Sequence, residues 1–464
     1  MHKMTNIRLL NWRGLLIILL FHFAFSSFLY WASYNGLFSS LHNNNGAWFF
    51  ARDTILYFYE SEILLEKYID GIGFFESFAF FPNHLHIPFM AKAKDLIFPG
   101  YYAYFLFSSL IYVSCIGLVY VASNKFLKVG KKSSFAISAI FLFPSFVMMT
   151  AVPLREVFLF FGLAIIYFSL TWINSKDRNF SFTPYFLFPL GVMIVIATKA
   201  YLMVFAIIAL SSYLVIILFS KKENKILIAA YVLTLISILT NSNIRDGRFD
   251  SDSMNREVKN IKFLMENAGI NSSNVDHNDE VALNSKKMAL NYYESKIIPK
   301  KAVDVNKEST FDLYSKRLID KINYTTLTFL EYPDQGSRIE DYIIHDSIKS
   351  LVSYLPIAIK RVFIAPPLDD IYKESKTLGK WAYFVAVLEN TIILGLLIFS
   401  ISKIHMLSIS SSVIIILSIL LMILLGYILT NYGAIIRLRM GYVSLLWIFL
   451  LSNFFANQKK FLGS

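Results

Sequence analysis

Apolar residues along the chain gather in long blocks and do not recur at the spacing of a soluble core. The first block runs from Gly14 to Ser33, and similar blocks follow over much of the sequence. A block of about 20 apolar residues matches the roughly 30 Å hydrocarbon core of a bilayer. Backbone polar groups in lipid must be satisfied within their own segment, so each block is predicted to be a helix. The pattern therefore predicts an all-α fold, a polytopic transmembrane helical bundle.

About ten spans are expected, and the first is predicted to be a retained span because no small-residue cleavage site follows it. Their predicted bounds are 14–33, 101–122, 134–152, 156–173, 183–198, 201–220, 226–240, 381–401, 407–430 and 440–456.

These spans divide the chain into three predicted regions. An N-terminal membrane region covers 1–240, with about seven spans and an external loop at 34–99. A large external loop region at 241–379 lies between spans seven and eight, and a C-terminal membrane region with about three spans covers 380–464.

Composition supports a membrane protein and excludes several other classes. Of the 464 residues, 56% are hydrophobic and 16% are charged, whereas soluble domains carry about 25% charged residues. A soluble enzyme and a disordered chain are therefore excluded. The single cysteine, Cys115, cannot form a disulfide within the chain, which also excludes a secreted disulfide scaffold.

The net charge of +12 is explained by topology. Both termini and alternate loops carry fifteen basic residues against two acidic ones, and positive loops remain in the cytoplasm. Both termini are thus predicted to be cytoplasmic and the two long loops external, and no nucleic-acid partner is expected. The basic residues are Lys3, Arg8, Arg13, Lys125, Lys128, Lys131, Lys132, Lys176, Arg178, Lys221, Lys222, Lys225, Lys403, Lys459 and Lys460.

Two external stretches are predicted to lie at the membrane interface. Residues 350–367 combine apolar and basic positions and are interpreted as an interfacial helix. The aromatic stretch 74–90 is interrupted by prolines and contains His84 and His86, which we interpret as polar tips at the interface. Two histidines without acids at ligand spacing make a weak metal site. No metal site is predicted and no cofactor is required, although the external carboxylates are compatible with a divalent ion.

Four clusters of ionisable residues fall at the predicted outer boundary of the membrane. Such residues are costly there and usually pair with one another or line a functional site. Each residue taken singly also fits a structural role, as an ion pair or a headgroup anchor. All four clusters are predicted on the same face of the membrane, which favours a functional role for the set over separate structural roles. The clusters are Arg52-Asp53 with Glu60 and Glu62, Arg155-Glu156, Lys199, and Arg437 with Arg439.

One chemistry suits such a set of charges. Transfer of a sugar from a lipid phosphate needs a base near the acceptor hydroxyl and cations around the leaving phosphate. A carboxylate can accept the proton, and arginines form forked hydrogen bonds to phosphate oxygens.

A different reading depends on Glu389, which lies inside predicted span eight beside Asn390. A carboxylate at that depth is expected to be protonated or to pair with a basic residue of a neighbouring helix. Asn390 is expected to make a polar contact between helices. A buried acid also fits a proton-coupled transporter, which remains an alternative.

Three stretches resemble bacterial membrane glycosyltransferases of the GT-C class, which use polyprenyl-phosphate-linked donors. Asp53 followed by Tyr57 and the stretch LLEKYIDG is similar to the first external loop of that class, where an aspartate is the catalytic base. The string DLIFPGYYAYFLFSSLIY is similar to the entry of its second span. The strings FPSFVMMTAVPLRE and IIRLRMGYV resemble two of its later turns.

The related O-antigen polymerases also fit, because they have a large external loop whose arginines engage undecaprenyl diphosphate. The loop after residue 241 contains arginines at five positions that would suit this reading, namely Arg245, Arg248, Arg256, Arg317 and Arg338.

The resemblance implies an enzyme of the bacterial inner membrane that assembles surface polysaccharide (O-antigen or lipopolysaccharide). It would transfer a sugar or oligosaccharide from an undecaprenyl-linked donor to a glycan or lipid-linked acceptor on the periplasmic face. Alternatives are an O-antigen polymerase, a lipid-linked oligosaccharide flippase or transporter, and a non-catalytic scaffold. The expected general base is Asp53, with Glu60 or Glu62 as substitutes. The remaining expected roles are phosphate binding by Arg155, Lys199, Arg437 and Arg439, and orientation of Arg155 by Glu156.

Overall fold

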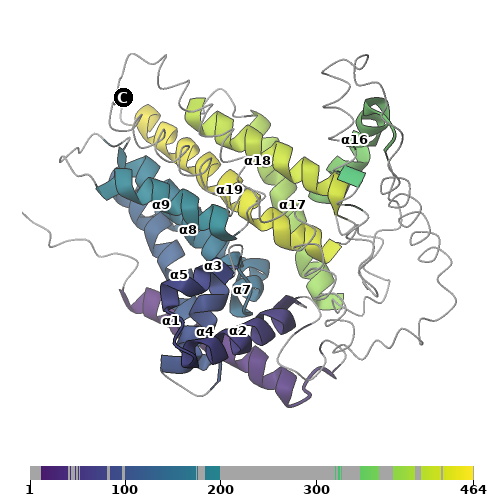
Figure 1. Ribbon diagram of the computed structural model, residues 1–464. Helices are drawn as coiled ribbons and strands as arrows, with labels where there is room; N and C mark the ends of the chain where they lie inside the picture. The colour runs from purple at the N-terminus through teal and green to yellow at the C-terminus, as the bar shows by residue number, and fades with distance from the viewer. Residues whose placement is uncertain are drawn as a thin grey trace, which may run out of the picture. The chain divides into compact units, whose positions relative to one another are not determined.

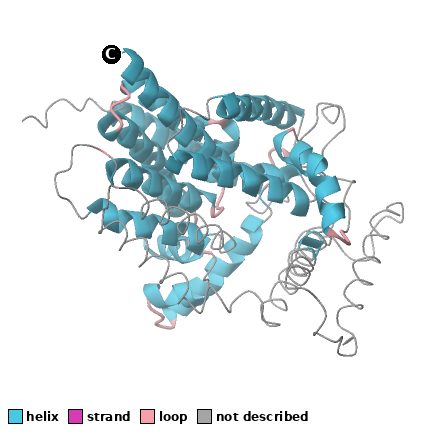
Figure 2. Cartoon of the chain, turned by 90° about the horizontal axis from the view of Figure 1, so that it is seen from above, coloured by secondary structure: helices cyan, strands magenta, loops and turns pink. Residues whose placement is uncertain are grey.

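The described part of the chain is built from helices, as the computed structural model shows in Figures 1 and 2. No strand occurs among the described residues, in which a single isolated bridge joins His42 to Trp48. The all-α prediction is therefore confirmed for this part. The described residues are 12–39, 42, 48, 51, 53–80, 84–96, 100–173, 175, 183–198, 319, 322–323, 326, 345–364, 380–402, 409–429 and 432–462.

Several helices are long and apolar enough to cross a membrane, so the protein is a membrane protein with transmembrane helices. Among the described residues there are four, or up to five with one bent pair. They lie in α1 (Trp12–Tyr34), in α5 (Tyr102–Val121) with the π-helical turn η3 (Ala122–Phe126), in α8 (Glu156–Ile173) and in α19 (Tyr432–Leu462). The expected ten-span bundle is not confirmed. Predicted spans 201–220 and 226–240 lie outside the described residues.

Predicted span 134–152 is a bent pair and not one straight helix. It consists of α6 (Lys131–Ser138), the 3-10 turn η4 (Ala139–Leu142) and α7 (Pro144–Ala151), with a bend of 55°. The break follows from Pro144, because a proline disfavours helical geometry in the preceding residue. Phe143 accordingly has an extended backbone with ψ of 140°. Proline then fits the first turn of α7, where its missing N–H costs nothing.

Helix α8 packs along α9 (Thr183–Thr198) through a crossing of two glycines (Figure 1). A methyl group at Gly162 would lie 2.8 Å from Val195 and 2.9 Å from the carbonyl oxygen of Gly191. Small residues at such a crossing let two helix backbones approach closely within a membrane. The close approach at Gly162 and Gly191 therefore explains how α9, a 16-residue helix that contains Pro189, packs against α8.

The segment between α1 and α5 folds into three helices, α2 (Asp53–Ile69), α3 (Phe74–Phe80) and α4 (His86–Leu96). An aromatic cluster centred on Tyr30 of α1 anchors it: the Tyr30 ring lies 5.8 Å from that of Phe58 on α2 and 5.4 Å from that of Phe105 on α5, between ring centroids. Edge contacts of this kind add to the burial of the rings themselves. The segment predicted as an external loop thus contains three helices, over 53–69, 74–80 and 86–96.

Contacts divide the chain into two compact units, each considered by itself. Unit 1 comprises Met1–Asn255, Gly395–Ile419 and Met440–Ser464, and unit 2 comprises Arg256–Leu394 and Leu420–Arg439. Within unit 1, the Tyr167 hydroxyl on α8 makes hydrogen bonds with Ser123 and with Ser452 on α19.

Unit 2 contains α16 (Ile348–Phe363) together with parts of α17 (Lys380–Ser402), α18 (Ile409–Ile428) and α19. The Tyr427 hydroxyl donates to the carbonyl oxygen of Leu351 at 2.7 Å, which ties α18 to α16. The helix predicted over 350–367 is thus present with shifted bounds. Its outer face exposes an apolar stripe at helical spacing, formed by Ile348, Val352, Leu355 and Ile359.

Candidate functional site

Helix α2 carries the first group of predicted site residues. Asp53 opens the helix, where a carboxylate interacts favourably with the helix dipole, and Lys67 stands in the last turn. Asp53, Tyr57 and Glu60 follow at spacings of four and three residues, so they share one face of α2. The sequence therefore places two carboxylates and a tyrosine in a row along this face.

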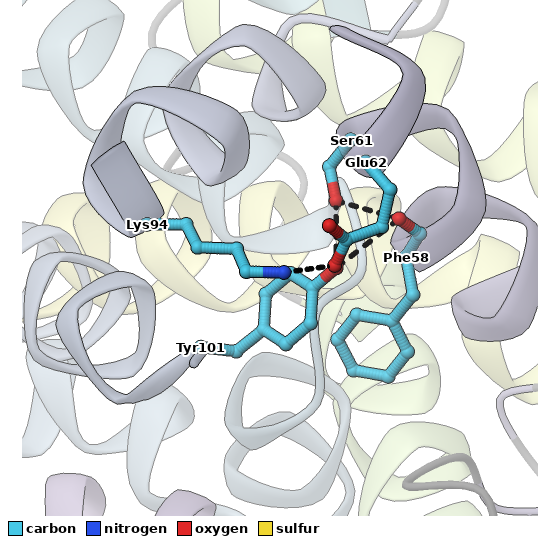
Figure 3. Close-up of polar contacts among 5 residues, drawn as sticks. All are labelled: Phe58, Ser61, Glu62, Lys94 and Tyr101. Carbon is cyan, nitrogen blue, oxygen red and sulfur yellow. Dashed lines mark hydrogen bonds and ion pairs between the residues drawn. The ribbon is translucent and has the colours of Figure 1, made fainter. Parts of the chain in front are cut away.

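Glu62 lies at the centre of a polar cluster that joins α2 to α4 and to the start of α5 (Figure 3). Its carboxylate accepts hydrogen bonds from the Lys94 ammonium and, at 2.6 Å, from the Tyr101 hydroxyl. Tyr101 also lies 3.0 Å from the Ser61 hydroxyl and 3.1 Å from the carbonyl oxygen of Phe58. These contacts hold the Glu62 carboxylate in a fixed orientation.

The same contacts set the ionisation of the two groups. Partial burial works against the charged form of Glu62, but the hydrogen bonds from Lys94 and Tyr101 and the positive charge of Lys94 outweigh it, so the pKa of Glu62 is lowered. Burial, followed by the hydrogen bond to Glu62, raises the pKa of the Tyr101 hydroxyl. A carboxylate stabilised in its charged form is a poor proton acceptor. Glu62 is thus better suited to holding α4 than to the predicted role of substitute base.

Glu60 pairs with a histidine that precedes α4. Nδ1 of His84 lies 3.3 Å from Oε2 of Glu60, and the two side chains are 26% and 15% exposed. The His84 ring meets the edge of the Tyr57 ring, with centroids 5.2 Å apart. A carboxylate on one imidazole nitrogen fixes the tautomer and leaves the other nitrogen able to accept a proton.

His86 occupies the other side of Tyr57 and is fully buried. Their ring centroids are 4.3 Å apart, and the rings of His84 and His86 are 5.9 Å apart. Neither ring nitrogen of His86 has a hydrogen-bond partner among the described residues. Burial lowers the pKa of His86 well below its ordinary value, and the charges of His84 and Arg155 lower it further. The interpretation of His86 as an interfacial polar tip is therefore wrong: α2, α4 and the residues before α8 enclose it.

Arg155 and Glu156 stand at the start of α8 and reach the same cluster. Arg155 is close enough to His86 for its charge to act on that ring. Glu156 is 1% exposed and interacts electrostatically with Tyr104, which also interacts with Tyr57. A buried carboxylate at the first position of a helix is stabilised by the helix dipole. The described members of two of the four predicted clusters thus lie together in unit 1, around Tyr57, whereas Arg52 lies outside the described residues.

The other predicted phosphate-binding residues lie elsewhere. Lys199 lies outside the described residues, and Arg437 and Arg439 belong to unit 2. The guanidinium of Arg439 is 2% exposed and donates to the side-chain oxygen of Asn390 and to the carbonyl oxygen of Val362.

Glu389 lies close enough to Arg439 for an electrostatic interaction, as expected for a carboxylate at that depth. The predicted polar contact of Asn390 between helices is confirmed by its hydrogen bond from Arg439.

Sequence reasoning missed part of this site. Lys94 belonged to no motif, and Tyr101 stood only in the string that resembles the entry of a second span. Lys92 and Lys94, seven and five residues before Pro99, could have been read as charges facing the acids of α2. The sequence pattern singles out His84 and His86, but Glu60, the partner of His84, is 24 residues away from it. No set of three or more histidine, cysteine or acidic side chains among the described residues could hold a metal ion.

Comparisons with known proteins give no family for this chain. No known protein family, no curated protein and no solved structure matches it. Function must therefore be argued from the arrangement of Glu60, His84, Arg155 and their neighbours.

Proposed function

We propose that the protein is a bacterial inner-membrane glycosyltransferase of surface-polysaccharide assembly. It transfers a sugar or oligosaccharide from an undecaprenyl-linked donor to a glycan or lipid-linked acceptor at the periplasmic face, with both termini in the cytoplasm. Asp53, Glu60 and Glu62 are the candidate carboxylates, and Arg155, oriented by Glu156, is the candidate phosphate ligand.

The observation that carries the proposal is the joining of α2, α4 and the start of α8 around Tyr57. This cluster supplies a carboxylate–imidazole pair and an arginine next to apolar helices long enough to span a membrane. Group transfer from a lipid phosphate needs both elements: a proton acceptor for the attacking hydroxyl and a cation for the leaving phosphate oxygens. The lipid carrier would enter from the bilayer beside these helices.

Two other functions receive less support. A transporter needs ionisable residues along a path through its helices, whereas Glu389 and Arg439 interact with each other inside unit 2. An O-antigen polymerase shares the donor and the membrane face, and the arginines that would distinguish it at positions 245, 248, 256, 317 and 338 lie outside the described residues.

Transfer by purified protein tests the proposal. Protein in detergent, without any gradient, is supplied with a labelled undecaprenyl-linked oligosaccharide and a lipid-linked acceptor. The proposal predicts a labelled, elongated or glycosylated acceptor. Labelled material that crosses liposome membranes without being joined to an acceptor would contradict it and favour a transporter.

A further inference from the structure

The pairing of Glu60 with His84 identifies a proton-accepting group that the resemblance to glycosyltransferases does not assign. The sequence also offers the carboxylates of Asp53 and Glu62 as candidates for the general base. Glu62 is already engaged by Lys94 and Tyr101. Asp53 lies at the start of α2, where a carboxylate interacts favourably with the helix dipole.

His84 has the geometry of an oriented base. Its Nδ1 faces the Glu60 carboxylate at 3.3 Å, and the Tyr57 ring lies against the imidazole in a T-shaped arrangement. Within the described part of the chain, Nε2 of His84 has no hydrogen-bond partner, and the side chain is 26% exposed. An imidazole held by a carboxylate through one nitrogen presents the other to a substrate proton.

A proton acceptor acts only if the leaving group is held nearby. The rings of His84 and His86 are 5.9 Å apart, and the charge of Arg155 acts on His86. His86 is fully buried, and both His84 and Arg155 lie close enough to act on its ring electrostatically. The cluster thus brings a proton acceptor and a cation for phosphate oxygens to the surroundings of one buried ring.

We propose that His84, oriented by Glu60, is the general base that deprotonates the acceptor hydroxyl. This inference rests on the proposed glycosyl transfer. Nε2 of His84 takes the hydroxyl proton while the acceptor oxygen forms a bond to the anomeric carbon of the donor sugar. The bond from that carbon to the phosphate oxygen breaks, and the phosphate leaves with the electron pair beside Arg155. His84 afterwards releases the proton to water.

The experiment compares wild-type protein with His84→Ala and His84→Gln in the detergent transfer assay. Both variants should lose at least about 100-fold in kcat, because general base catalysis contributes that much or more. The KM for the donor should stay within about threefold, since the base does not bind the phosphate. Imidazole added to His84→Ala should restore activity at least tenfold.

Matched variants separate this role from a structural one. Lys92→Ala on α4 should keep wild-type activity, because the partly exposed Lys92 side chain pairs with Asp95 and not with Glu60, His84 or Arg155. Asp53→Asn tests the other candidate base in the same assay. Thermal unfolding verifies that each variant is folded. If His84→Ala does not fold, the activity of His84→Gln alone tests the assignment.

The outcomes are distinguishable. Full activity in His84→Gln, or a loss in His84→Ala that imidazole does not restore, overturns the assignment of His84 and leaves glycosyl transfer standing. Loss of activity in Asp53→Asn with full activity in His84→Ala returns the base to Asp53. Absence of transfer by wild-type protein with any undecaprenyl-linked donor overturns the proposed function itself.

Discussion

Glu62 on α2 and Lys94 on α4, 32 positions apart in the sequence, form an ion pair that the Tyr101 hydroxyl completes. The pair joins α4 to α2, and His84 stands just before α4. The two side chains are 45% and 24% exposed, so solvent screens the pair. We expect its contribution to the free energy of unfolding to be about 1 kcal/mol or less.

The stabilisation by Glu62 should depend on pH. Its pKa in the folded protein lies below the ordinary value of 4.5, so the unfolded state binds the proton more readily. The contribution is therefore fully present above about pH 4.5 and is lost as the pH falls through the folded pKa. Thermal unfolding of wild type and Glu62→Gln should differ most at neutral pH and converge in acid.

A matched variant on the same helix controls that experiment. Glu66 is exposed on α2, and Glu66→Gln should unfold like wild type at every pH. An equal loss of stability in Glu62→Gln and Glu66→Gln would mean that net charge, and not the pair with Lys94, sets the pH dependence.

The Tyr101 hydroxyl should contribute more to the free energy of unfolding than the hydroxyl of its partner Ser61. Tyr101 is 5% exposed and its hydroxyl interacts with Glu62, Ser61 and the carbonyl oxygen of Phe58. Tyr101→Phe removes these contacts in a buried site and should lower the free energy of unfolding by about 1–2 kcal/mol. Ser61→Ala should cost less, and the double variant should cost less than the sum, because the two hydroxyls interact directly. Denaturant unfolding in detergent measures all three.

Bulk at the crossing of α8 and α9 should be poorly tolerated. Gly162→Val places side-chain atoms against Val195 and the Gly191 carbonyl oxygen, and we expect a loss of about 1–3 kcal/mol from overpacking. Gly117→Ala on α5 is the control, since nothing lies within 4 Å of its added methyl group. An equal lowering of the thermal unfolding temperature in both variants would contradict a close crossing of α8 and α9.

Part of this structure could be predicted from hydrophobic blocks alone. The bounds of α8 and α9 agree with the predicted spans 156–173 and 183–198, because each apolar block stands between polar or proline-containing turns. Pro144 lies inside the apolar block 134–152, but the length of a block does not predict a bend in the helix. The enclosure of His86 could not be predicted, since it depends on which neighbours α4 acquires and not on its own spacing.

A buried histidine in α1 shows the same limit. His22 makes hydrogen bonds to Ser109 at 2.8 Å and Thr150 at 3.0 Å, which link α1 to α5 and α7. These partners are 87 and 128 positions away, so no local pattern indicates them. A lone polar residue in an apolar block predicts that a partner exists, but the fold decides which one.

Substitution of Arg439 tests whether this residue has a structural or a phosphate-binding role in unit 2. Arg439→Met leaves Glu389 and Asn390 buried without their cationic neighbour and should cost about 3 kcal/mol of unfolding free energy. The half-buried Arg437 is the comparison, and Arg437→Met should cost less. Unchanged unfolding of Arg439→Met together with weakened binding of an undecaprenyl-linked donor would instead support the predicted phosphate role.

Glycan ladders separate transferase from polymerase within the proposed function. Cells that lack the protein should lose one sugar from every repeat if it is a single-sugar transferase. Loss of long chains with single repeats retained would identify a polymerase.

The most direct measurement is the release of the lipid carrier by purified protein in detergent, followed together with glycan product in wild type and Arg155→Gln. Wild type should release one undecaprenyl carrier for each sugar or oligosaccharide joined, with no gradient present. Arg155→Gln should do so at least about 100-fold more slowly, because a cation beside the leaving phosphate is lost. Equal rates in the two proteins, or carrier-linked glycan that wild type never cleaves, would contradict the account.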